Sequence, residues 1–214
     1  MPIDTRRDPR LVAALFADVI GSKAIADRAF LSRSLALTAR TLNAAFEPAV
    51  TEPFAIVAGD EIQGALADPA QAPLCLTVLR ETLAPIRARA TVAIGIVETL
   101  PARDRPRDPF AAAADNLAGL KRSGGLTSYS GTGPAGDILL NAICRLVDPL
   151  LEARSDKQWE AIAAYRRLGQ QRAVADELGV TRQSVGDRLA AGNWRASEDA
   201  AAAIAAYLSL ICGT

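Results

Sequence analysis

A chain of 214 residues, half of them hydrophobic, can bury a sizeable core, either as one domain with a small appendage or as two compact domains. Lysine plus arginine and aspartate plus glutamate balance at 24 each, so the overall charge does not indicate a nucleic-acid binder. The chain has no histidine and its three cysteines are far apart, which excludes a His-dependent catalytic triad and a paired-cysteine zinc site.

The cysteines and the start of the chain bear on where the protein works. Cys75, Cys144 and Cys212 are expected to pack as small apolar side chains in a reducing cytoplasm. Three arginines stand within the first ten residues without a long apolar run before a cleavage site, so we expect no secretion signal. No apolar stretch reaches the length of a membrane span, and the sequence therefore predicts a cytoplasmic protein without membrane contact.

Hydrophobic spacing predicts strands alternating with helices over the first 130 residues. Strands are expected at 11–19, 54–66, 89–99 and 126–130, and helices at 27–47, 73–83 and 109–121. A Gly-Asp-Glu tripeptide breaks the second of these strands and predicts a tight hairpin there. The segment 101–108, rich in proline and arginine, is expected to be a surface loop. The alternation is typical of an α/β or α+β sandwich in which helices cover a sheet.

The rest of the chain is predicted to be helical. Amphipathic helices are expected at 138–153 and 155–168, so we place a domain boundary between residues 153 and 154. An alanine-rich helix is expected to begin with Ser197 as its cap and to end near Ile211. It would pack on the helix-turn-helix motif at 170–189 or pair with a second copy of the chain. The predicted domains are therefore 1–153 and 154–214.

The stretch from Gln170 to Leu189 has the pattern of a helix-turn-helix. Six apolar residues are spaced as the inner faces of two short helices, Gly179 stands where the chain turns, and Thr181 is suited to cap the second helix. The outward side chains of that second helix are of the types that reach base edges and phosphates in the major groove. The predicted DNA contacts are Arg182, Gln183, Ser184 and Arg188, with Arg172 and Thr181 on phosphates. A solvated helical hairpin in an all-helical tail remains the alternative.

The same region carries a small excess of positive charge. Residues 166–195 contain six arginines against three acidic residues. A modest basic face of this kind predicts salt-sensitive binding to double-stranded DNA that needs two copies of the motif, so we expect a homodimer.

Three carboxylates stand at predicted strand ends. Asp18 closes the first strand, and Asp60 and Glu61 lie in the Gly-Asp-Glu hairpin. If these strands are neighbours, Asp18 and Asp60 face each other with Glu61 nearby, and a divalent cation held by oxygen ligands would relieve their repulsion. Mg²⁺ fits better than zinc because histidine is absent and no cysteine is suitably spaced. In the alternative, Asp18 caps the following loop and Glu61 is solvated.

Several short motifs occur in an order that resembles the SatD family of bacterial proteins. They are ADVIGSK at 17–23, GDEIQG at 59–64, VAIGIVE at 92–98, and a C-terminal helix-turn-helix preceded by the pair Gln158-Trp159. The resemblance spans nearly the whole chain. It implies a DNA-binding regulator rather than a defined reaction.

The N-terminal motifs are also similar, more distantly, to the ferredoxin-like catalytic domain of class III nucleotide cyclases. In that family an aspartate of the first strand and an aspartate of a Gly-Asp hairpin hold two metal ions under a triphosphate, and Asp18 and Asp60 match these. Gly21 matches the glycine that follows the first aspartate. The resemblance implies an α+β, ferredoxin-like, cyclase-like domain, followed here by the small all-α helix-turn-helix domain.

The cyclase pattern is incomplete in the helix expected at 109–121. The family places an asparagine one helical turn before a transition-state arginine; Asn116 matches the asparagine, but Leu120 stands where the arginine is expected. The neighbouring Lys121 is expected to point elsewhere on the helix. A SatD-like helix normally begins Ala-Arg where this chain has Ala114-Asp115. Loss of an arginine that neutralises phosphate charge removes much of the expected catalysis, so metal or nucleotide binding is expected to survive better than turnover.

These observations support a main hypothesis and two alternatives. The first is a cytoplasmic, dimeric DNA-binding regulator whose N-terminal domain senses a ligand or holds subunits together. The second is a metal-dependent enzyme that binds or converts a nucleotide through Asp18 and Asp60, with Gly21 and Asn116 at the nucleotide. The third is an adaptor whose helix-turn-helix binds protein.

Overall fold

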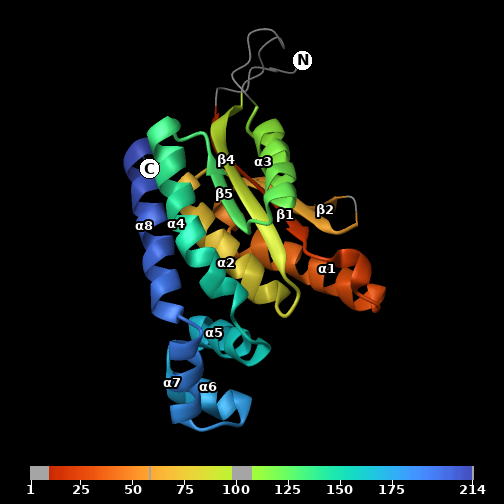
Figure 1. The fold of residues 1–214 in the computed structure, drawn as a ribbon, viewed down its shortest axis with the longest axis vertical. Coiled ribbons are helices and arrows are strands. Elements are labelled where there is room, and N and C mark those ends of the chain that lie inside the picture. Colours follow the sequence, from red (N-terminus) through yellow and green to blue (C-terminus); the bar gives the residue numbers. More distant parts are fainter. Residues whose placement is uncertain (1–9, 58, 98–107, 214) are drawn as a thin grey trace, which may run out of the picture.

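The computed structural model describes residues 10–57, 59–97 and 108–213 (Figure 1). A five-stranded sheet in the order β2-β3-β1-β4-β5 forms its centre. All neighbouring strands are antiparallel except β4 and β5, which are parallel. The strands are β1 Arg10–Val19, β2 Val50–Val57, β3 Glu61–Leu66, β4 Ala88–Val97 and β5 Thr127–Ser130. The predicted α+β class is therefore confirmed, with the hairpin between β2 and β3 at the Gly-Asp-Glu tripeptide.

Alternate side chains of β1 bury the two faces of the sheet in different cores. Leu15 and its odd-numbered neighbours belong to a large cluster that also contains the buried faces of α1 (Arg28–Ala45) and α2 (Ala72–Leu83). Phe16 and Ala14 pack on the other face against α3 (Pro109–Ser123), the helix that crosses from β4 to the parallel strand β5. The two-residue period of a strand explains this division, because successive side chains point to opposite faces.

The helices begin where the sequence supplies caps. The Asp27 carboxylate accepts a hydrogen bond from the Phe30 backbone N–H at 2.7 Å and opens α1. Asp108 caps α3 in the same way through Phe110, and it is the one residue of the expected 101–108 loop that lies inside the described ranges. Three short 3-10 turns complete this part of the chain: η1 Ser22–Ala24, η2 Glu47–Ala49 and η3 Pro69–Gln71.

The C-terminal third is entirely helical in the described residues. Its helices are α4 Pro134–Glu152, α5 Asp156–Leu168, α6 Gln171–Leu178, α7 Arg182–Ala191 and α8 Trp194–Cys212. Helices α5, α6 and α7 bury a small core of their own, centred on Ile162, Val174 and Val185. These three helices protrude below the sheet in Figure 1, while α4 and α8 run alongside it.

The last helix differs from the expectation in its start and in its packing. It begins at Trp194 after Asn193, which has a left-handed backbone conformation, so Ser197 is inside the helix rather than its cap. The Ser197 hydroxyl instead donates to the Trp194 carbonyl. Ile204 and Leu208, on the buried face of α8, join the large core under the sheet. The expected assignment of the whole segment 154–214 to a separate domain therefore does not match the packing of α8.

Candidate functional site

Helices α6 and α7 are joined by a three-residue turn whose geometry depends on two residues. Gly179 ends α6 in the left-handed region at φ 63°, which a residue with a side chain rarely adopts. The Thr181 hydroxyl then accepts a hydrogen bond from the Ser184 N–H at 3.1 Å and caps α7. The two predicted helices and their turn are thus present as the sequence indicated.

Most of the predicted DNA contacts lie on the outside of this unit. Arg172, Thr181, Arg182 and Gln183 are exposed and Ser184 is half-buried. Arg188 is different, because its guanidinium lies 3.4 Å from the Glu160 carboxylate of α5 and its side chain is only 17% exposed. Glu160 therefore partly neutralises the charge of Arg188, and the prediction that this side chain points freely outward was wrong.

Of the six arginines in residues 166–195, three are held in ion pairs. Arg167 pairs with Glu177 at 2.6 Å, and Arg166 and Arg188 are also in ion pairs. Among the residues that the structure describes, Arg172, Arg182 and Arg195 have no ion pair at this end of the molecule. The arginines without an ion pair in the described part of this surface are therefore three, beside the exposed Asp176 and Asp187.

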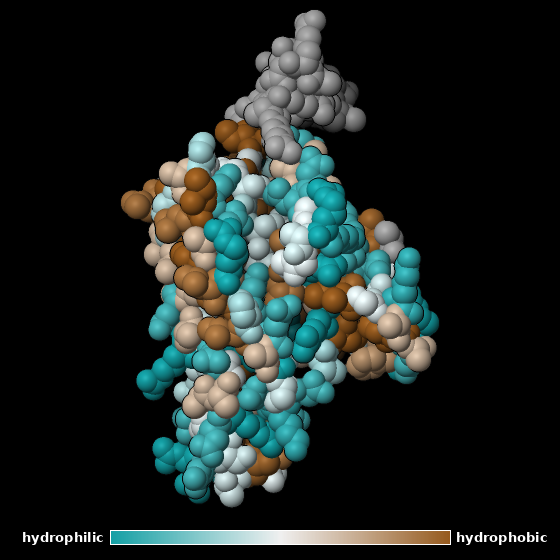
Figure 2. Space-filling view, viewed as in Figure 1, coloured by the Kyte–Doolittle hydropathy of each residue, from teal (hydrophilic) through white to brown (hydrophobic). Residues whose placement is uncertain are grey.

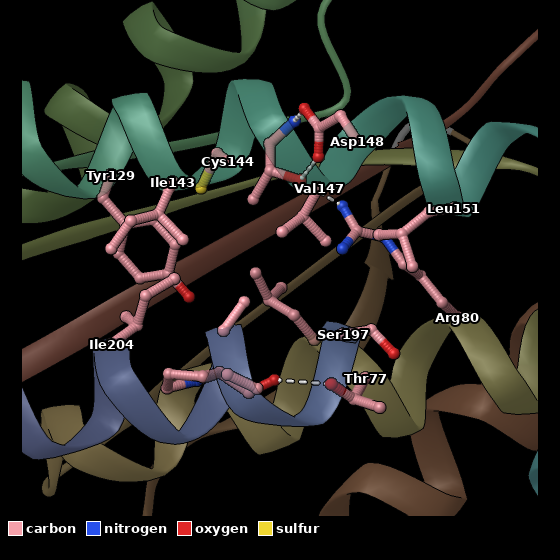
Figure 3. A pocket seen from close by; sticks show the side chains of 15 residues that line it. Thr77, Arg80, Tyr129, Ile143, Cys144, Val147, Asp148, Leu151, Ser197 and Ile204 are labelled. Carbon is pink, nitrogen blue, oxygen red and sulfur yellow. Dashed lines mark hydrogen bonds between the residues drawn. The ribbon is translucent and has the colours of Figure 1, made fainter. Parts of the chain in front are cut away.

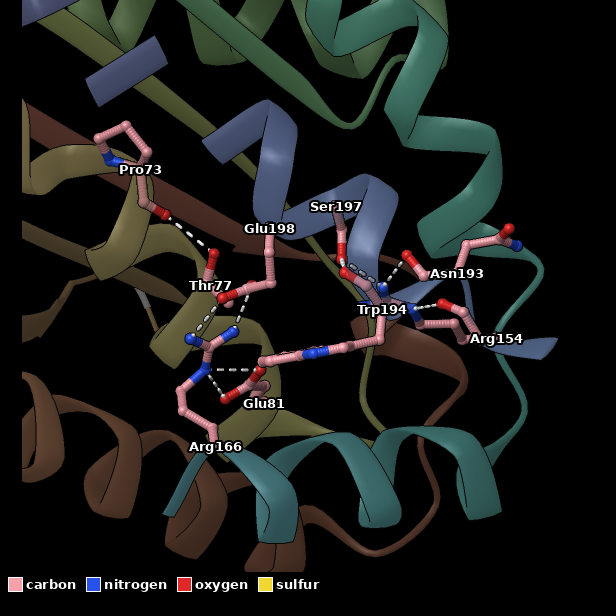
Figure 4. Close-up of polar contacts among 10 residues, drawn as sticks. Pro73, Thr77, Glu81, Arg154, Arg166, Asn193, Trp194, Ser197 and Glu198 are labelled. Atoms are coloured by element: carbon pink, nitrogen blue, oxygen red, sulfur yellow. Dashed lines mark hydrogen bonds and ion pairs between the residues drawn. The ribbon is translucent and has the colours of Figure 1, made fainter. Parts of the chain in front are cut away.

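Arg166 attaches the α5–α7 unit to the rest of the chain (Figure 4). Its Nε lies 2.7 Å from Glu81 of α2, its Nη2 lies 2.6 Å from Glu198 of α8, and its guanidinium stacks 4.6 Å above the Trp194 ring. Burial lowers the pKa of Arg166, but its hydrogen bonds with Glu198 and Glu81 outweigh this and raise it, so the group stays charged. Burial raises the pKa of Glu81 despite this partner.

A second buried arginine fixes the junction between α7 and α8. Arg154 is 5% exposed, donates from Nε to the Gly192 carbonyl at 2.6 Å, and donates from Nη2 to the Ser197 hydroxyl at 2.7 Å. Its guanidinium also lies 4.6 Å from the centre of the Trp159 ring. Burial lowers the pKa of Arg154 to about 10. No local sequence pattern marks Arg154 or Arg166 as a clamp, because their partners are distant in the chain.

The carboxylates of Asp18 and Glu61, at the ends of neighbouring strands, share one lysine as their partner. Asp18 and Glu61 are direct partners in the β1–β3 register, and the Lys121 ammonium lies 2.8 Å from Asp18 and 3.8 Å from Glu61. Arg89 of β4 lies 3.7 Å from Asp18 on its other side. The hydrogen bond to Asp18 raises the pKa of Lys121. The prediction that Lys121 points elsewhere was wrong; it follows buried Leu117 by four residues, a spacing that places it on the sheet-facing side of α3.

The other candidate side chains at this end, Asp60 and Asn116, have partners of their own. The register places Glu61, not Asp60, opposite Asp18, and the Asp60 carboxylate accepts a short hydrogen bond from the Ser22 hydroxyl instead. Gly21 has φ 67° and opens the 3-10 turn that carries Ser22. Asn116 donates to the Ser130 hydroxyl of β5 at 2.7 Å. The predicted pairing of Asp18 with Asp60 is therefore replaced by Asp18 with Glu61, because antiparallel neighbours pair directly across the ladder.

The arrangement does not fit a divalent cation without rearrangement. No group of three or more Asp, Glu or Cys side chains converges to hold a metal ion in the described part of the chain. The Lys121 ammonium occupies the space beside Asp18 and Glu61 where a cation would bind. A positive side chain there relieves carboxylate repulsion as a metal would.

A small pocket lies between α2, β5, α4 and α8 (Figure 3). Its volume is about 60 Å³, and its polar lining includes Arg80, Tyr129 and Asp148. The Asp148 carboxylate accepts three hydrogen bonds from Leu126 and Thr127, whereas Nε of Arg80 is buried without a partner. Arg80 is next to Glu81, so adjacent residues of α2 face the pocket and the Arg166 clamp.

Two of the three cysteines confirm the expected packing role. Cys75 and Cys144 are buried, and burial raises the pKa of the Cys144 thiol to about 12 and that of Cys75 further. Cys212 is only partly buried. None of the helices in the described ranges is both long enough and apolar enough to span a lipid bilayer.

Comparison with known proteins gives weak structural likenesses only. No family model and no curated protein matches the chain. A bacterial light-regulated adenylyl cyclase aligns over 57% of this chain and 44% of its own with 11% identity and a TM-score of 0.41, so this chain spans less than half of that one. An EAL/GGDEF domain protein from M. capsulatus aligns over 58% of this chain and 87% of its own, with 21% identity and a TM-score of 0.44.

A third structure is similar over more of the chain. A regulator of polyketide synthase expression from Bifidobacterium adolescentis aligns over 97% of this chain and 80% of its own, with 14% identity and a TM-score of 0.31. The solved structures similar to this chain therefore include cyclase-like domains and a regulator, at levels that assign it neither a family nor an activity.

Proposed function

We propose that this chain is a DNA-binding transcriptional regulator of the SatD type that binds double-stranded DNA as a homodimer. The observation that carries the proposal is the pair of helices α6 and α7, whose turn is formed by Gly179 and whose second helix is capped by Thr181. Their outer surface carries Arg172, Arg182 and Gln183, exposed and without an ion pair in the described residues. This is the geometry in which a second helix enters the major groove with its N-terminal residues on base edges.

The roles within this surface follow from side-chain chemistry. Arg182 and Gln183, in the first turn of α7, would read bases, because arginine pairs with guanine and glutamine with adenine in a bidentate way. Arg172 and the N–H groups that open α7 would contact phosphates. Arg188 would contribute only after it leaves Glu160, so its role is secondary.

The test is a fluorescence-anisotropy titration of the full chain against DNA from upstream of its own gene. The double variant Arg182→Ala, Gln183→Ala should weaken specific binding by tenfold or more, since a bidentate base contact contributes about 1–3 kcal/mol of discrimination. Arg33→Ala, which removes an equally exposed arginine from α1, is the matched control and should bind as the unchanged chain does. Equal binding by all three proteins would refute the assignment.

The N-terminal domain is proposed to position the DNA-binding helices and to sense a ligand. The support is the placement of adjacent residues of α2: Arg80 lines the pocket and has a buried Nε without a partner, and Glu81 holds Arg166 of α5. A ligand that brings a hydrogen-bond acceptor to Arg80 would act one residue away from the clamp. Such a ligand would be small, given the pocket of about 60 Å³.

The second candidate function is binding or conversion of a nucleotide with Mg²⁺ at Asp18, Asp60 and Glu61. The paired carboxylates Asp18 and Glu61 at one strand edge favour it. The Lys121 ammonium beside Asp18 argues against a metal ion there, but as a cation it could itself bind a phosphate group of the nucleotide. Isothermal titration with Mg²⁺ and ATP or GTP tests this function, which is refuted if the unchanged chain gives no heat or Asp60→Ala gives equal heat.

A further inference from the structure

The molecule exposes a concentrated apolar surface on α4 and α8. Five of its large exposed hydrophobic side chains belong to these two helices: Ile138, Leu139, Leu146, Leu210 and Ile211. Three of them are exposed nearly as in an unfolded chain, with Ile138 at 70%, Leu146 at 76% and Leu210 at 80%. In Figure 2, brown side chains gather over the upper parts of α4 and α8, on one flank of the molecule. We call these five residues the α4–α8 face.

The two helices run side by side in opposite directions. Gly136, at the start of α4, lies so close to the Tyr207 hydroxyl near the end of α8 that an added Cβ would be 2.5 Å from it. The start of α4 and the end of α8, which carry Ile138, Leu139, Leu210 and Ile211, therefore lie at the same end of the helix pair, where Figure 2 shows apolar side chains gathered. A contiguous exposed patch of this type marks an interaction surface in a folded protein.

Charge is almost absent from the α4–α8 face. Residues 200–213 of the chain, which form most of α8, contain no charged residue. In α4, Arg145 is the only charged residue between Asp137 and Asp148. A half-exposed helix that remains in water normally carries charged residues on its outer face, whereas interface cores lack them.

We propose that the α4–α8 face is the surface through which two copies of this chain pair. Two antiparallel helices of 19 residues present a face of roughly 28 by 20 Å, since a helix rises about 1.5 Å per residue and is about 10 Å wide. That face of roughly 560 Å² is smaller than the ~800 Å² of accessible surface that each partner buries in a standard interface, and is of the size of a modest one. A patch without charge can be complementary to itself across a two-fold axis, as an isologous contact requires.

The choice of a second copy as the occupant rests on the proposed DNA-binding function. Helix α8 runs from the α7 junction at Trp194 to the α4–α8 face at Leu210 without a break. A two-fold axis along α8 would therefore place both α5–α7 units at the same end of the dimer (Figure 1). Two recognition helices on one side of a dimer are what a palindromic site needs.

The test measures mass in the absence of DNA. Sedimentation velocity at 1–100 µM, concentrations of the order at which modest interfaces assemble, should show twice the 22.5 kDa of one chain. Ile138→Glu and Leu210→Glu should each weaken self-association by tenfold or more, because each buries a charge in the apolar interface. Leu37→Glu, at a leucine 49% exposed on α1, is the matched control and should remain a dimer.

The other outcomes of the sedimentation experiment contradict the proposal. An unchanged chain that stays monomeric up to 100 µM rules out a second copy as the occupant of the α4–α8 face. A dimer that persists in both glutamate variants, or that Leu37→Glu abolishes, places the interface elsewhere. Circular dichroism confirms that the variants are folded, which is expected because the altered side chains are mostly exposed. If the unchanged chain is a dimer but does not bind DNA, the DNA-binding function is refuted and the pairing surface is not.

Discussion

Arg166 and Glu81, 85 positions apart in the sequence, meet at 2.7 Å and join the α5–α7 unit to helix α2. The Glu81 side chain is 6% exposed, and the same guanidinium also holds Glu198 of α8. A carboxylate buried to this extent depends on its partner, because an unpaired buried charge is costly. Arg166 thus contacts both α2 and α8 and helps to fix how helices α5–α7 sit on the rest of the chain.

Replacing Arg166 with alanine is therefore expected to destabilise the protein more than a surface mutation does. Removing one partner of a buried ion pair costs about 3–5 kcal/mol, and partial exposure of Arg166 places the expected loss at the lower end, near 3 kcal/mol. Urea unfolding followed by circular dichroism measures it. The double variant Arg166→Met, Glu81→Leu should recover part of the loss, because it removes the buried carboxylate of Glu81, whereas Glu198 loses its partner but is 33% exposed to water. An equal loss in both variants would contradict this account of the clamp.

Lys121 is predicted to exclude divalent cations from Asp18 and Glu61. Its ammonium is 2.8 Å from Asp18, so Lys121→Gln removes the competing charge while it retains a side chain of similar length. Titration with Mn²⁺, followed by electron paramagnetic resonance, should then show at least tenfold tighter binding than in the unchanged chain. Arg122→Gln is the control: it removes the charge of the neighbouring exposed arginine of α3 and should not change Mn²⁺ binding. Unchanged affinity in Lys121→Gln would mean that the ammonium does not occupy a cation site.

The same lysine is predicted to make stability depend on alkaline pH. The hydrogen bond to Asp18 raises the pKa of Lys121 above its value in the unfolded chain. A raised pKa stabilises the folded state fully below the unfolded value of about 10.4, and this contribution is lost as the pH rises through the folded pKa. The difference in urea midpoint between the unchanged chain and Lys121→Gln should therefore shrink above pH 10. A difference that stays constant from pH 8 to pH 11 would contradict the contact.

Two glycines of the α6–α7 unit are predicted to respond in opposite ways to alanine. Gly179 has φ 63°, and an L-residue in that conformation costs about 1–2 kcal/mol, so Gly179→Ala should lower the melting temperature. Gly186 lies inside α7, and a Cβ there would meet Gln171 at an ordinary 3.7 Å. Gly186→Ala should therefore raise stability by about 0.5–1 kcal/mol through helix propensity. Differential scanning calorimetry compares the two, and a stabilising Gly179→Ala would rule out the turn.

The sequence predicted the local structure well because the signals were local. The apolar run at 11–19, the helical spacing from residue 27 and the glycine at 179 are signals within a few residues, and the structure has a strand, a helix start and a turn at these places. The start of α8 was missed because Asn193 takes a left-handed conformation without the glycine that usually marks one.

Contacts between distant segments could not be read from the sequence in the same way. The Arg166–Glu81 pair joins residues from α5 and α2, and no local pattern distinguishes such a pair from solvated charges. The pairing of Asp18 with Glu61 rather than Asp60 depends on a strand register, and a shift of one residue exchanges the face of every side chain. Lys121 was predicted wrongly although a signal existed, since its spacing of four residues from Leu117 places it beside the buried face of α3.

The central claim, that α7 reads DNA, is tested most directly by selection of binding sites from fragmented genomic DNA with the purified full chain, followed by sequencing. The account predicts enrichment of a short palindromic motif that disappears with Arg182→Ala, Gln183→Ala and persists with Arg33→Ala. No enriched motif with the unchanged chain, or the same motif with the double variant, would contradict it.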